Sequence, residues 1–202
     1  MPSLPYVYAT LLGYLLGSIP FGFLLTKAAG LGDIRAIGSG NIGATNVLRT
    51  GKKGLAVLTL LLDAGKGAAA VLLAEKFVPG GAQLAGLAAL LGHMFPVWLK
   101  FKGGKGVATA MGIITALFWP LGVAAMSSWL VLAFLLRYSS LAAIVSLGVA
   151  PFCVFSIGRR DLVALTALIA LLVIARHAPN IRRLLNGTEP RIGKDNHATP
   201  PA

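Results

Sequence analysis

Long apolar stretches with almost no charged residues are the feature of this chain that most limits its fold. A helix needs about 20 predominantly apolar residues to cross a bilayer. Only 12% of the 202 residues are charged, about half the share usual in soluble domains. The stretches occupy residues 6–26, 55–74, 82–99, 107–136, 141–157 and 162–175, and the fourth has a break at Pro120 and Gly122. We therefore predict an all-α polytopic integral membrane protein with about seven transmembrane helices. Because the last stretch is short, five or six spans remain as alternatives.

The basic residues are distributed unevenly between the loops that join these stretches. In membrane proteins Lys and Arg accumulate on the cytoplasmic side. With the N-terminus outside, fourteen of the 18 basic residues fall in inner loops and the C-terminal tail. We therefore expect the C-terminus in the cytoplasm. The same topology brings three polar segments to one face, residues 38–49, 92–109 and 175–193, called the first, second and third segments below.

The net charge of +12 is also informative. A nucleic-acid binder is basic but not this apolar, so no nucleic-acid partner is expected. In a membrane protein such charge attracts anionic lipid headgroups and phosphate-bearing substrates. We expect one membrane-embedded catalytic domain over residues 1–193, and a disordered tail over residues 194–202.

Two features lie inside the predicted spans. Gly13 and Gly17 form a GxxxG pair, which lets another helix approach closely. Asp63 and Lys66 are three residues apart and lie on one helix face, where a mutual ion pair would reduce the cost of burying both charges. A structural and a functional role for that pair are both open.

The first segment is rich in glycine and in neutral hydrogen-bonding side chains. Glycines permit unusual backbone dihedrals, so that successive amides can converge on an anion. Arg49 ends the segment with a planar guanidinium suited to phosphate. A flexible, solvated loop is the alternative interpretation. The candidate residues here are Ser39, Gly40, Asn41, Gly43, Thr45, Asn46 and Arg49.

The second segment contains a Gly-Gly-Lys-Gly turn at residues 103–106 before an apolar run. Free amides and the dipole at a helix N-terminus favour an anion there. The turn lacks the GxxxxGK[ST] pattern of nucleotide hydrolases. Lys100 and Lys102, beside Trp98, are also explained as interfacial anchors. The candidate residues are Gly103, Gly104, Lys105 and Gly106.

The third segment begins at the mouth of the last apolar stretch. His177 and Asn180 are three residues apart, a spacing that would let both orient a hydroxyl or a phosphate. An interfacial histidine without a chemical role is the alternative. The single cysteine, Cys153, and the scattered aspartates give no metal-binding pattern, so neither a metal nor a cofactor is expected.

Together the three segments resemble the three motifs of the bacterial membrane glycerol-3-phosphate acyltransferases that use acyl phosphate as donor. The resemblance covers essentially the whole chain, because motif order and spacing agree as well as the residues. It implies transfer of a fatty acyl group from acyl phosphate to the 1-hydroxyl of glycerol 3-phosphate, giving lysophosphatidic acid and phosphate as the first step of phospholipid synthesis. It also implies a multi-pass protein of the bacterial inner membrane, with a cytoplasmic active site, and allows for an association with the enzyme that makes acyl phosphate.

By the same resemblance, the substrate or the reacting centre would contact Ser39, Arg49, Lys105, His177 and Asn180, and Glu189 would hold the third segment in place. Acyl phosphate carries a good leaving group, so such an enzyme chiefly positions two anionic substrates. We expect Ser39, His177 and backbone amides to stabilise the oxyanion. Three proton acceptors stay open: His177, the phosphate of the substrate, and Ser39 as a covalent relay.

Other functions fit the sequence less well. Coenzyme A-dependent acyltransferases carry His-x4-Asp, but Trp98 and Arg182 stand five residues after His93 and His177. Metal-dependent phosphotransferases need several aspartates close together. An anion transporter should place polar residues deep in paired or broken spans, whereas the candidate groups here gather at one membrane surface.

Overall fold

The computed structural model describes residues 4–193, so the predicted tail over residues 194–202 lies outside the described part. Every regular element within residues 4–193 is helical. The α-helices are α1 (Leu4–Gly17), α2 (Phe21–Ala28), α3 (Ala44–Leu48), α4 (Lys53–Phe77), α5 (Ala82–Met94), α6 (Val107–Leu117), α7 (Trp119–Leu136), α8 (Ser139–Gly148), α9 (Ala150–Ser156), α10 (Val163–Arg176) and α11 (Ala178–Leu185). Three short 3₁₀ turns are η1 (Ile34–Ala36), η2 (Val97–Leu99) and η3 (Arg160–Leu162).

The described helices are long and apolar enough for several membrane crossings. Five segments are long and apolar enough to span a membrane: Leu4–Ala28, Lys53–Phe77, Ala82–Leu99, Trp119–Leu136 and Ser139–Ser156. A sixth is the bent pair of Arg160–Arg176 and Ala178–Leu185, and the apolar helix Val107–Leu117 is shorter than a full span. The prediction of a helical polytopic membrane protein is confirmed. A count of seven, and the side on which each terminus lies, stay predictions.

The surface and the interior fit a lipid solvent. Large apolar side chains are exposed along the helices, among them Leu61 at 62%, Phe134 at 83% and Leu171 at 64%. In water such a surface would be an aggregation hazard, whereas lipid solvates it. The main core lies between α5, α6, α8 and α10 and includes Leu90, Met94, Ile113, Leu147, Ile169 and Val173.

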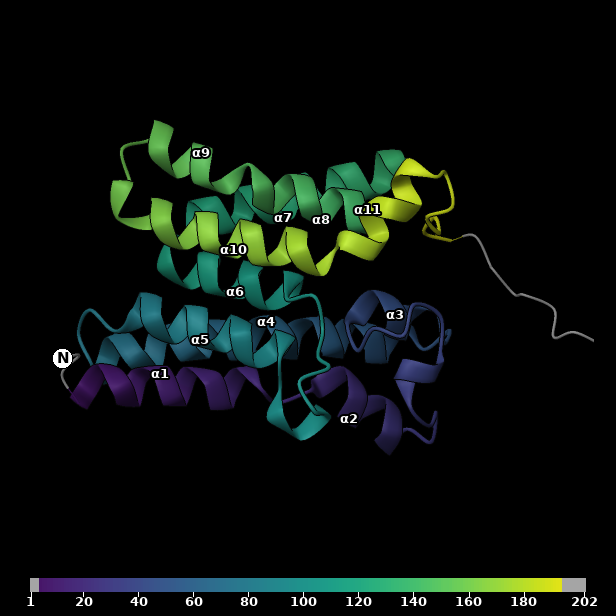
Figure 1. The fold of residues 1–202 in the computed structure, drawn as a ribbon, viewed down its shortest axis with the longest axis horizontal. Helices are drawn as coiled ribbons and strands as arrows, with labels where there is room; N and C mark the ends of the chain where they lie inside the picture. Colours follow the sequence, from purple (N-terminus) through teal and green to yellow (C-terminus); the bar gives the residue numbers. More distant parts are fainter. Residues whose placement is uncertain (1–3, 194–202) are drawn as a thin grey trace, which may run out of the picture.

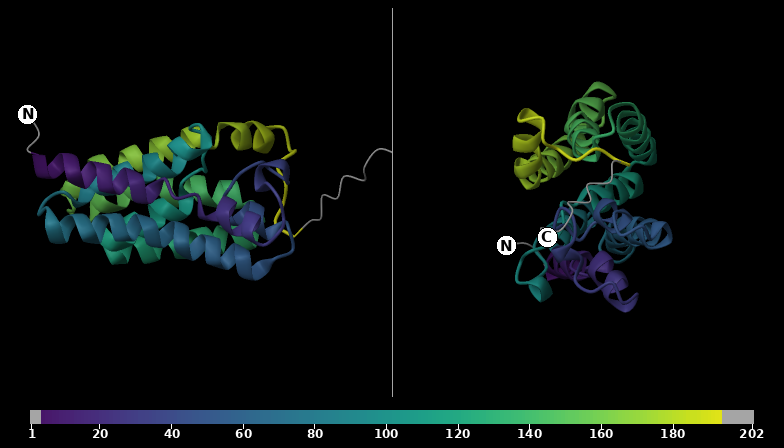
Figure 2. Two further views of the ribbon diagram at one scale, coloured as in Figure 1. Left: turned by 90° about the horizontal axis from the view of Figure 1, so that it is seen from below. Right: turned by 90° about the vertical axis from the view of Figure 1, so that its right-hand side faces the viewer.

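The helices form two groups that lie side by side along the long axis of the molecule. Figure 1 shows α1, α2, α4 and α5 in one group and α7 to α11 in the other, with α6 between them. The two groups are also separate when viewed end-on in Figure 2. Helix α1 packs on α5, and α4 packs on α5 and α6. The chain from α6 into α7 therefore joins the two groups.

The predicted glycine contact in the first span is confirmed. A Cβ atom on Gly13 would overlap the backbone of Ala85, and one on Gly17 would overlap the backbone of Ala89. Both partners belong to α5. The two glycines therefore let α1 and α5 meet backbone to backbone.

The three polar segments meet at one end of the molecule. In Figure 1, α3 and α11 lie at the end opposite the N-terminus. The loop that leads from α5 into α6 also lies on that side of α5, after its C-terminal end. The three segments therefore lie toward the same end of the helices, and the side of the membrane that this end faces stays a prediction.

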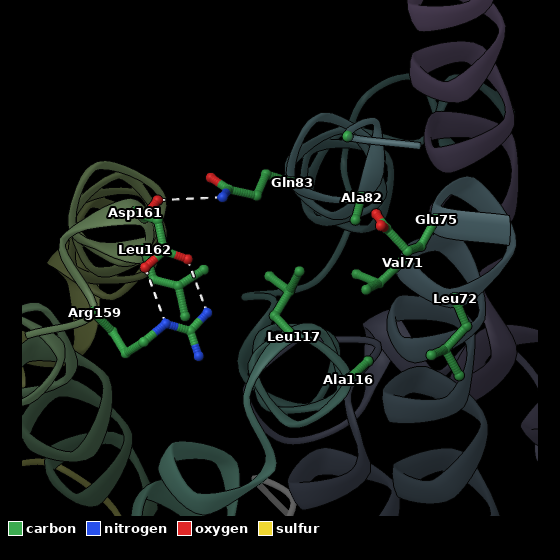
Figure 3. Close-up of a pocket in the computed structure, with 11 residues that line it drawn as sticks. Val71, Leu72, Glu75, Ala82, Gln83, Ala116, Leu117, Arg159, Asp161 and Leu162 are labelled. Carbon is green, nitrogen blue, oxygen red and sulfur yellow. Dashed lines mark hydrogen bonds and ion pairs between the residues drawn. The ribbon is translucent and has the colours of Figure 1, made fainter. Parts of the chain in front are cut away.

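A cavity of about 390 Å³ lies away from these segments. Figure 3 shows it between the ends of α4 and α6, the start of α5 and the turn η3 that precedes α10. Arg159 pairs with Asp161 there at 2.8 Å, and the Gln83 side chain donates to the Asp161 backbone carbonyl at 3.2 Å. None of the predicted site residues lines this cavity.

Candidate active site

The first segment is held in shape by the side chain of Asn46, which is 2% exposed. Its Oδ1 accepts hydrogen bonds from the backbone amide of Ser39 at 2.9 Å and from the Ser39 hydroxyl at 3.2 Å. Its Nδ2 donates to the carbonyls of Ile34, Ile37 and Asn41 at 3.1, 2.9 and 2.8 Å. Asn46 therefore fixes the loop that presents Ser39 at the surface.

Glycine is required where this loop turns. Gly38 and Gly40 have φ values of 56° and 68°, in the left-handed region that side chains disfavour. A Cβ on Gly38 would lie 3.0 Å from Cδ of Arg49 and 3.2 Å from its Nη1, so the arginine side chain runs across that glycine. Gly43 stands before α3 as its N-cap. The hydroxyl of Thr45 lies 3.2 Å from the hydroxyl of Ser139, at the start of α8.

The second segment folds back on the end of α5. The amides of Gly103 and Gly104 donate to the carbonyls of Met94 and His93, both at 3.1 Å. The guanidinium of Arg176 donates to the carbonyls of Gly103 at 2.9 Å and Gly104 at 3.2 Å. The loop thus caps the carbonyl end of α5 and is tied to the end of α10. Gly106, with φ of 81°, is the N-cap residue directly before α6.

A chain of short hydrogen bonds joins the second and third segments. Lys105 Nζ donates to Oδ1 of Asn180 at 2.6 Å, and Nδ2 of Asn180 donates to Oε1 of Glu189 at 2.6 Å. The Ser140 hydroxyl donates to the same oxygen at 2.6 Å, and Arg183 Nε donates to Oε2 at 2.7 Å. The buried carboxylate of Glu189 therefore orients Asn180, and Asn180 orients Lys105.

Electrostatics bring the first segment into the same site. Burial lowers the pKa of Lys105 from 10.5 to about 8; Glu189 raises it, and Arg183, Arg49 and Arg176 lower it further. The three arginines come from the first and third segments, so all three segments contribute charge around one amine. Four cations face a single carboxylate here. This imbalance favours anionic ligands.

Glu189 stays ionised in this site. Burial acts to raise its pKa, but hydrogen bonds from Ser140, Asn180 and Arg183 lower it, and the pKa lies below its usual value. Hydrogen bonds to a charged acceptor are stronger than those between neutral groups. The interactions of Glu189 are with side chains of the protein.

His177 stands at a bend of 61° between α10 and α11. It is 3% exposed, and its Nδ1 lies 2.7 Å from the carbonyl of Val173. A carbonyl accepts, so Nδ1 carries the proton in this contact. In the neutral ring Nε2 is then an acceptor. Pro179 lies in the first turn of α11, where backbone amides have no partner within the helix, so the missing amide hydrogen of proline costs no hydrogen bond.

Sequence reasoning missed several residues of this site. Arg176 and Arg183 were counted among the basic residues of the inner side, but nothing in the sequence distinguished them as partners of Gly104 and Glu189. Ser140 lies outside all three segments, and only the fold brings it to Glu189. The backbone of Ile192 exchanges hydrogen bonds with Arg137, which fastens the end of the third segment to the C-terminal end of α7.

The fold and site together define a class, a polytopic helical membrane protein with a cation-rich anion site at one end. Comparison with known proteins narrows the class to a family. Residues 7–187 match the family described as glycerol-3-phosphate acyltransferase. A relative of that name from Mesorhizobium japonicum is 57% identical over 187 residues, covering 93% of this chain and 96% of the relative. One from Rhodospirillum rubrum is 54% identical, covering 99% and 97%. The chain belongs to the glycerol-3-phosphate acyltransferase family, as the sequence resemblance predicts.

Solved structures agree with this assignment. The glycerol 3-phosphate form of PlsY, an integral membrane glycerol 3-phosphate acyltransferase, superposes with a TM-score of 0.88 at 41% identity, covering 93% of this chain and 96% of that one. Its lysophosphatidic acid form gives a TM-score of 0.86 at 40% identity. The chain is therefore a multi-pass membrane protein with the helical fold of these structures.

Proposed function

We propose that this protein transfers a fatty acyl group from acyl phosphate to the 1-hydroxyl of glycerol 3-phosphate, giving lysophosphatidic acid and phosphate. The acceptor and product follow from the family and from the two bound forms of the structural neighbour. The acyl phosphate donor follows from the motif resemblance and from the chemistry of the site. No cofactor enters the proposed reaction.

The observation that carries the proposal is the hydrogen-bonded chain of Lys105, Asn180 and Glu189, with Arg49, Arg176 and Arg183 close enough to act on the Lys105 amine. Two phosphate-bearing substrates bring several negative charges together, and their mutual repulsion must be offset. The one carboxylate, Glu189, is already engaged by three side chains, and Arg183 is one of them. The positive charge of Lys105, Arg49 and Arg176 is then left to offset the charge of the substrates. A carboxylate-rich site would repel the same pair.

The predicted residues take distinct roles in this proposal. Lys105 and Arg49 bind phosphate, and Asn180 orients Lys105. Asn46 acts by positioning, because its amide is occupied within the loop. Asn41, Gly43, Thr45 and Gly106 supply amides or neutral polar groups for the phosphates. Gly40 permits close approach, because its amide already donates to the carbonyl of Ile37. The amides of Gly103 and Gly104 already bond to α5, so these two glycines contribute by permitting close approach.

The proposed reaction needs no covalent intermediate. The 1-hydroxyl oxygen attacks the acyl carbon, the bond from that carbon to the phosphate oxygen breaks, and phosphate leaves with the electron pair. Nε2 of His177 accepts the hydrogen bond of the attacking hydroxyl, because Nδ1 is held by Val173. The proton of that hydroxyl passes to the phosphate that leaves. Ser39 and backbone amides donate to the developing oxyanion. His177 thus acts as an acceptor in this proposal, and oxyanion donation falls to the other groups.

We propose that residues 1–193 work as one catalytic domain with the site on the cytoplasmic face of the bacterial inner membrane. The excess of basic residues on the segment side supports this orientation. Acyl phosphate would then reach the site from the enzyme that makes it. Labelling of single cysteines introduced into the third segment, from either side of sealed vesicles, tests the orientation. Labelling from the periplasmic side alone contradicts it.

The function is tested with purified protein, acyl phosphate and radiolabelled glycerol 3-phosphate. Labelled lysophosphatidic acid is expected with acyl phosphate and not with acyl-coenzyme A. The variant Lys105→Met is the matched inactive control, since it keeps the length of the side chain and removes its charge. Folded protein that forms no labelled product from acyl phosphate rules out the proposed reaction.

A further inference from the structure

A buried ionic cluster joins α4 to His93 of the second segment, and the proposed chemistry does not use it. Asp63 and Lys66 of α4 form an ion pair at 2.7 Å, with side chains 3% and 2% exposed. His93 Nδ1 lies 3.6 Å from Oδ1 of Asp63. No hydrogen bond satisfies that nitrogen within residues 4–193, so Asp63 is its available partner. The predicted pairing of Asp63 with Lys66 is therefore present, with a histidine added to it.

Stability alone is a weak explanation for this cluster. A buried ion pair is often no more stabilising than apolar residues of the same volume, because both charges lose their hydration. The cluster does connect separate elements. Lys66 Nζ donates to the carbonyl of Ile19 at 2.7 Å, in the break between α1 and α2, and lies 5.6 Å from the centre of the Phe21 ring. Helix α4, the break after α1 and the end of α5 are thus held as one unit around the Asp63 carboxylate.

The outer edge of the His93 ring lies directly against Gly104. A Cβ on Gly104 would overlap Nε2 of His93 and would lie 2.9 Å from its Cε1 and 3.0 Å from its Cδ2. The backbone of His93 also accepts the Gly104 amide at 3.1 Å. Gly104 is therefore held by both the ring and the backbone of one residue. Lys105, the next residue, carries the amine that points at Asn180.

We propose that His93 is a positioning residue for the Gly103–Gly106 turn, with its ring between Asp63 and Gly104 and acting as the surface against which Gly104 rests. This inference rests on the proposed function, because the consequence of a displaced turn is read as weaker binding of glycerol 3-phosphate through Lys105. His93 does not react. It sets where the backbone of Gly104, and hence the start of the Lys105 side chain, lies.

A double-mutant cycle tests the contact. Gly104→Ala adds a methyl group where the ring stands, and we expect KM for glycerol 3-phosphate to rise on the order of tenfold to a hundredfold. His93→Asn keeps a donor toward Asp63 and removes the outer edge of the ring. In the His93→Asn background, Gly104→Ala should raise KM much less, so the effects of the two substitutions on KM are strongly non-additive. His93→Ala serves as the second variant if His93→Asn folds poorly.

Gly103→Ala is the matched control. A Cβ there would meet the carbonyls of His93 and Met94 and the ring of Pro96, which a change in the His93 side chain does not remove. Its effect on KM should therefore be the same in the wild-type protein and in the His93→Asn background. Thermal unfolding in detergent is measured for each variant, so that KM is compared between folded proteins.

The outcomes separate this inference from the proposed function. An additive cycle, or a Gly104→Ala single variant with normal KM and normal unfolding temperature, overturns the positioning role while the wild-type protein remains an acyltransferase. Rescue of KM in the Gly104→Ala background by His93→Asn, and no rescue of Gly103→Ala, supports it. If the wild-type protein makes no lysophosphatidic acid, the proposed function fails, and calorimetric binding of glycerol 3-phosphate then completes the cycle.

Discussion

The lowered pKa of Lys105 predicts that binding of glycerol 3-phosphate weakens as pH rises. Burial lowers that pKa from 10.5 to about 8. The amine is charged below this value and neutral above it, and only the charged form attracts phosphate. Between pH 7 and pH 9 the charged share falls from about nine-tenths to about one-tenth, since each pH unit beyond the pKa changes the ratio tenfold. The apparent dissociation constant should therefore rise about tenfold, or about 1.4 kcal/mol.

Calorimetric titration of the wild-type protein at pH 7, 8 and 9 measures this change. The substrate adds little of its own, because the second pKa of a phosphate monoester is about 6 and the dianion prevails throughout. Lys105→Arg is the matched control, because a guanidinium stays charged in this range. The arginine variant should bind glycerol 3-phosphate more weakly at pH 7, because a guanidinium replaces the amine beside Asn180. Its affinity should then change little up to pH 9. A wild-type affinity that is constant from pH 7 to 9, or an equal tenfold loss in the arginine variant, refutes the assigned role.

Three further predictions concern the loop, the buried carboxylate and the helix contact. Ser39→Ala should lower kcat by about a hundredfold or more with a small change in KM, as for loss of an oxyanion donor; an unchanged kcat in the acyl-transfer assay contradicts that role. Glu189→Gln offers one acceptor oxygen in place of two and should lower the free energy of unfolding by about 2 kcal/mol, since hydrogen bonds to a charged group are each worth about 1.5–3 kcal/mol and the Arg183 contact is partly solvated. Thermal unfolding measures this loss, and a raised KM for glycerol 3-phosphate should accompany it. Gly13→Ala should lower the unfolding temperature, because the added Cβ overlaps the backbone of Ala85. Gly54→Ala, in open space on α4, should leave the unfolding temperature unchanged or slightly raised. Equal effects of the two substitutions would contradict the close packing of α1 on α5.

The positions of the helices were largely predictable because lipid imposes a strong length and composition signal. The breaks inside the apolar stretches were harder to predict. Residues 6–26 were expected as one span and lie within the candidate span Leu4–Ala28, but the helix is broken inside it, where Pro20 precedes α2. The break expected at Pro120 instead precedes it, at Phe118, because proline fits the first turn of a helix, where its missing amide needs no partner. Proline thus starts α7 instead of ending a helix.

The candidate site was predictable in its segments and not in its contacts. Glycine, asparagine and basic residues marked each segment locally. The partners of Glu189 come from residues 140, 180 and 183, and no local pattern relates Ser140 to the third segment. Asn46 was expected at the substrate, but its amide is occupied by five contacts within its own loop. Such assignments depend on tertiary geometry, which sequence spacing alone does not carry.

Direct acyl transfer between two anionic substrates, held by one cation-rich site, is the basis of the proposed function. It can be measured by following release of phosphate from acyl phosphate by the purified protein, with and without glycerol 3-phosphate. Release should require glycerol 3-phosphate and should equal the lysophosphatidic acid formed, one for one. A burst of phosphate equal to the amount of enzyme in the absence of glycerol 3-phosphate would reveal an acyl-enzyme and contradict direct transfer.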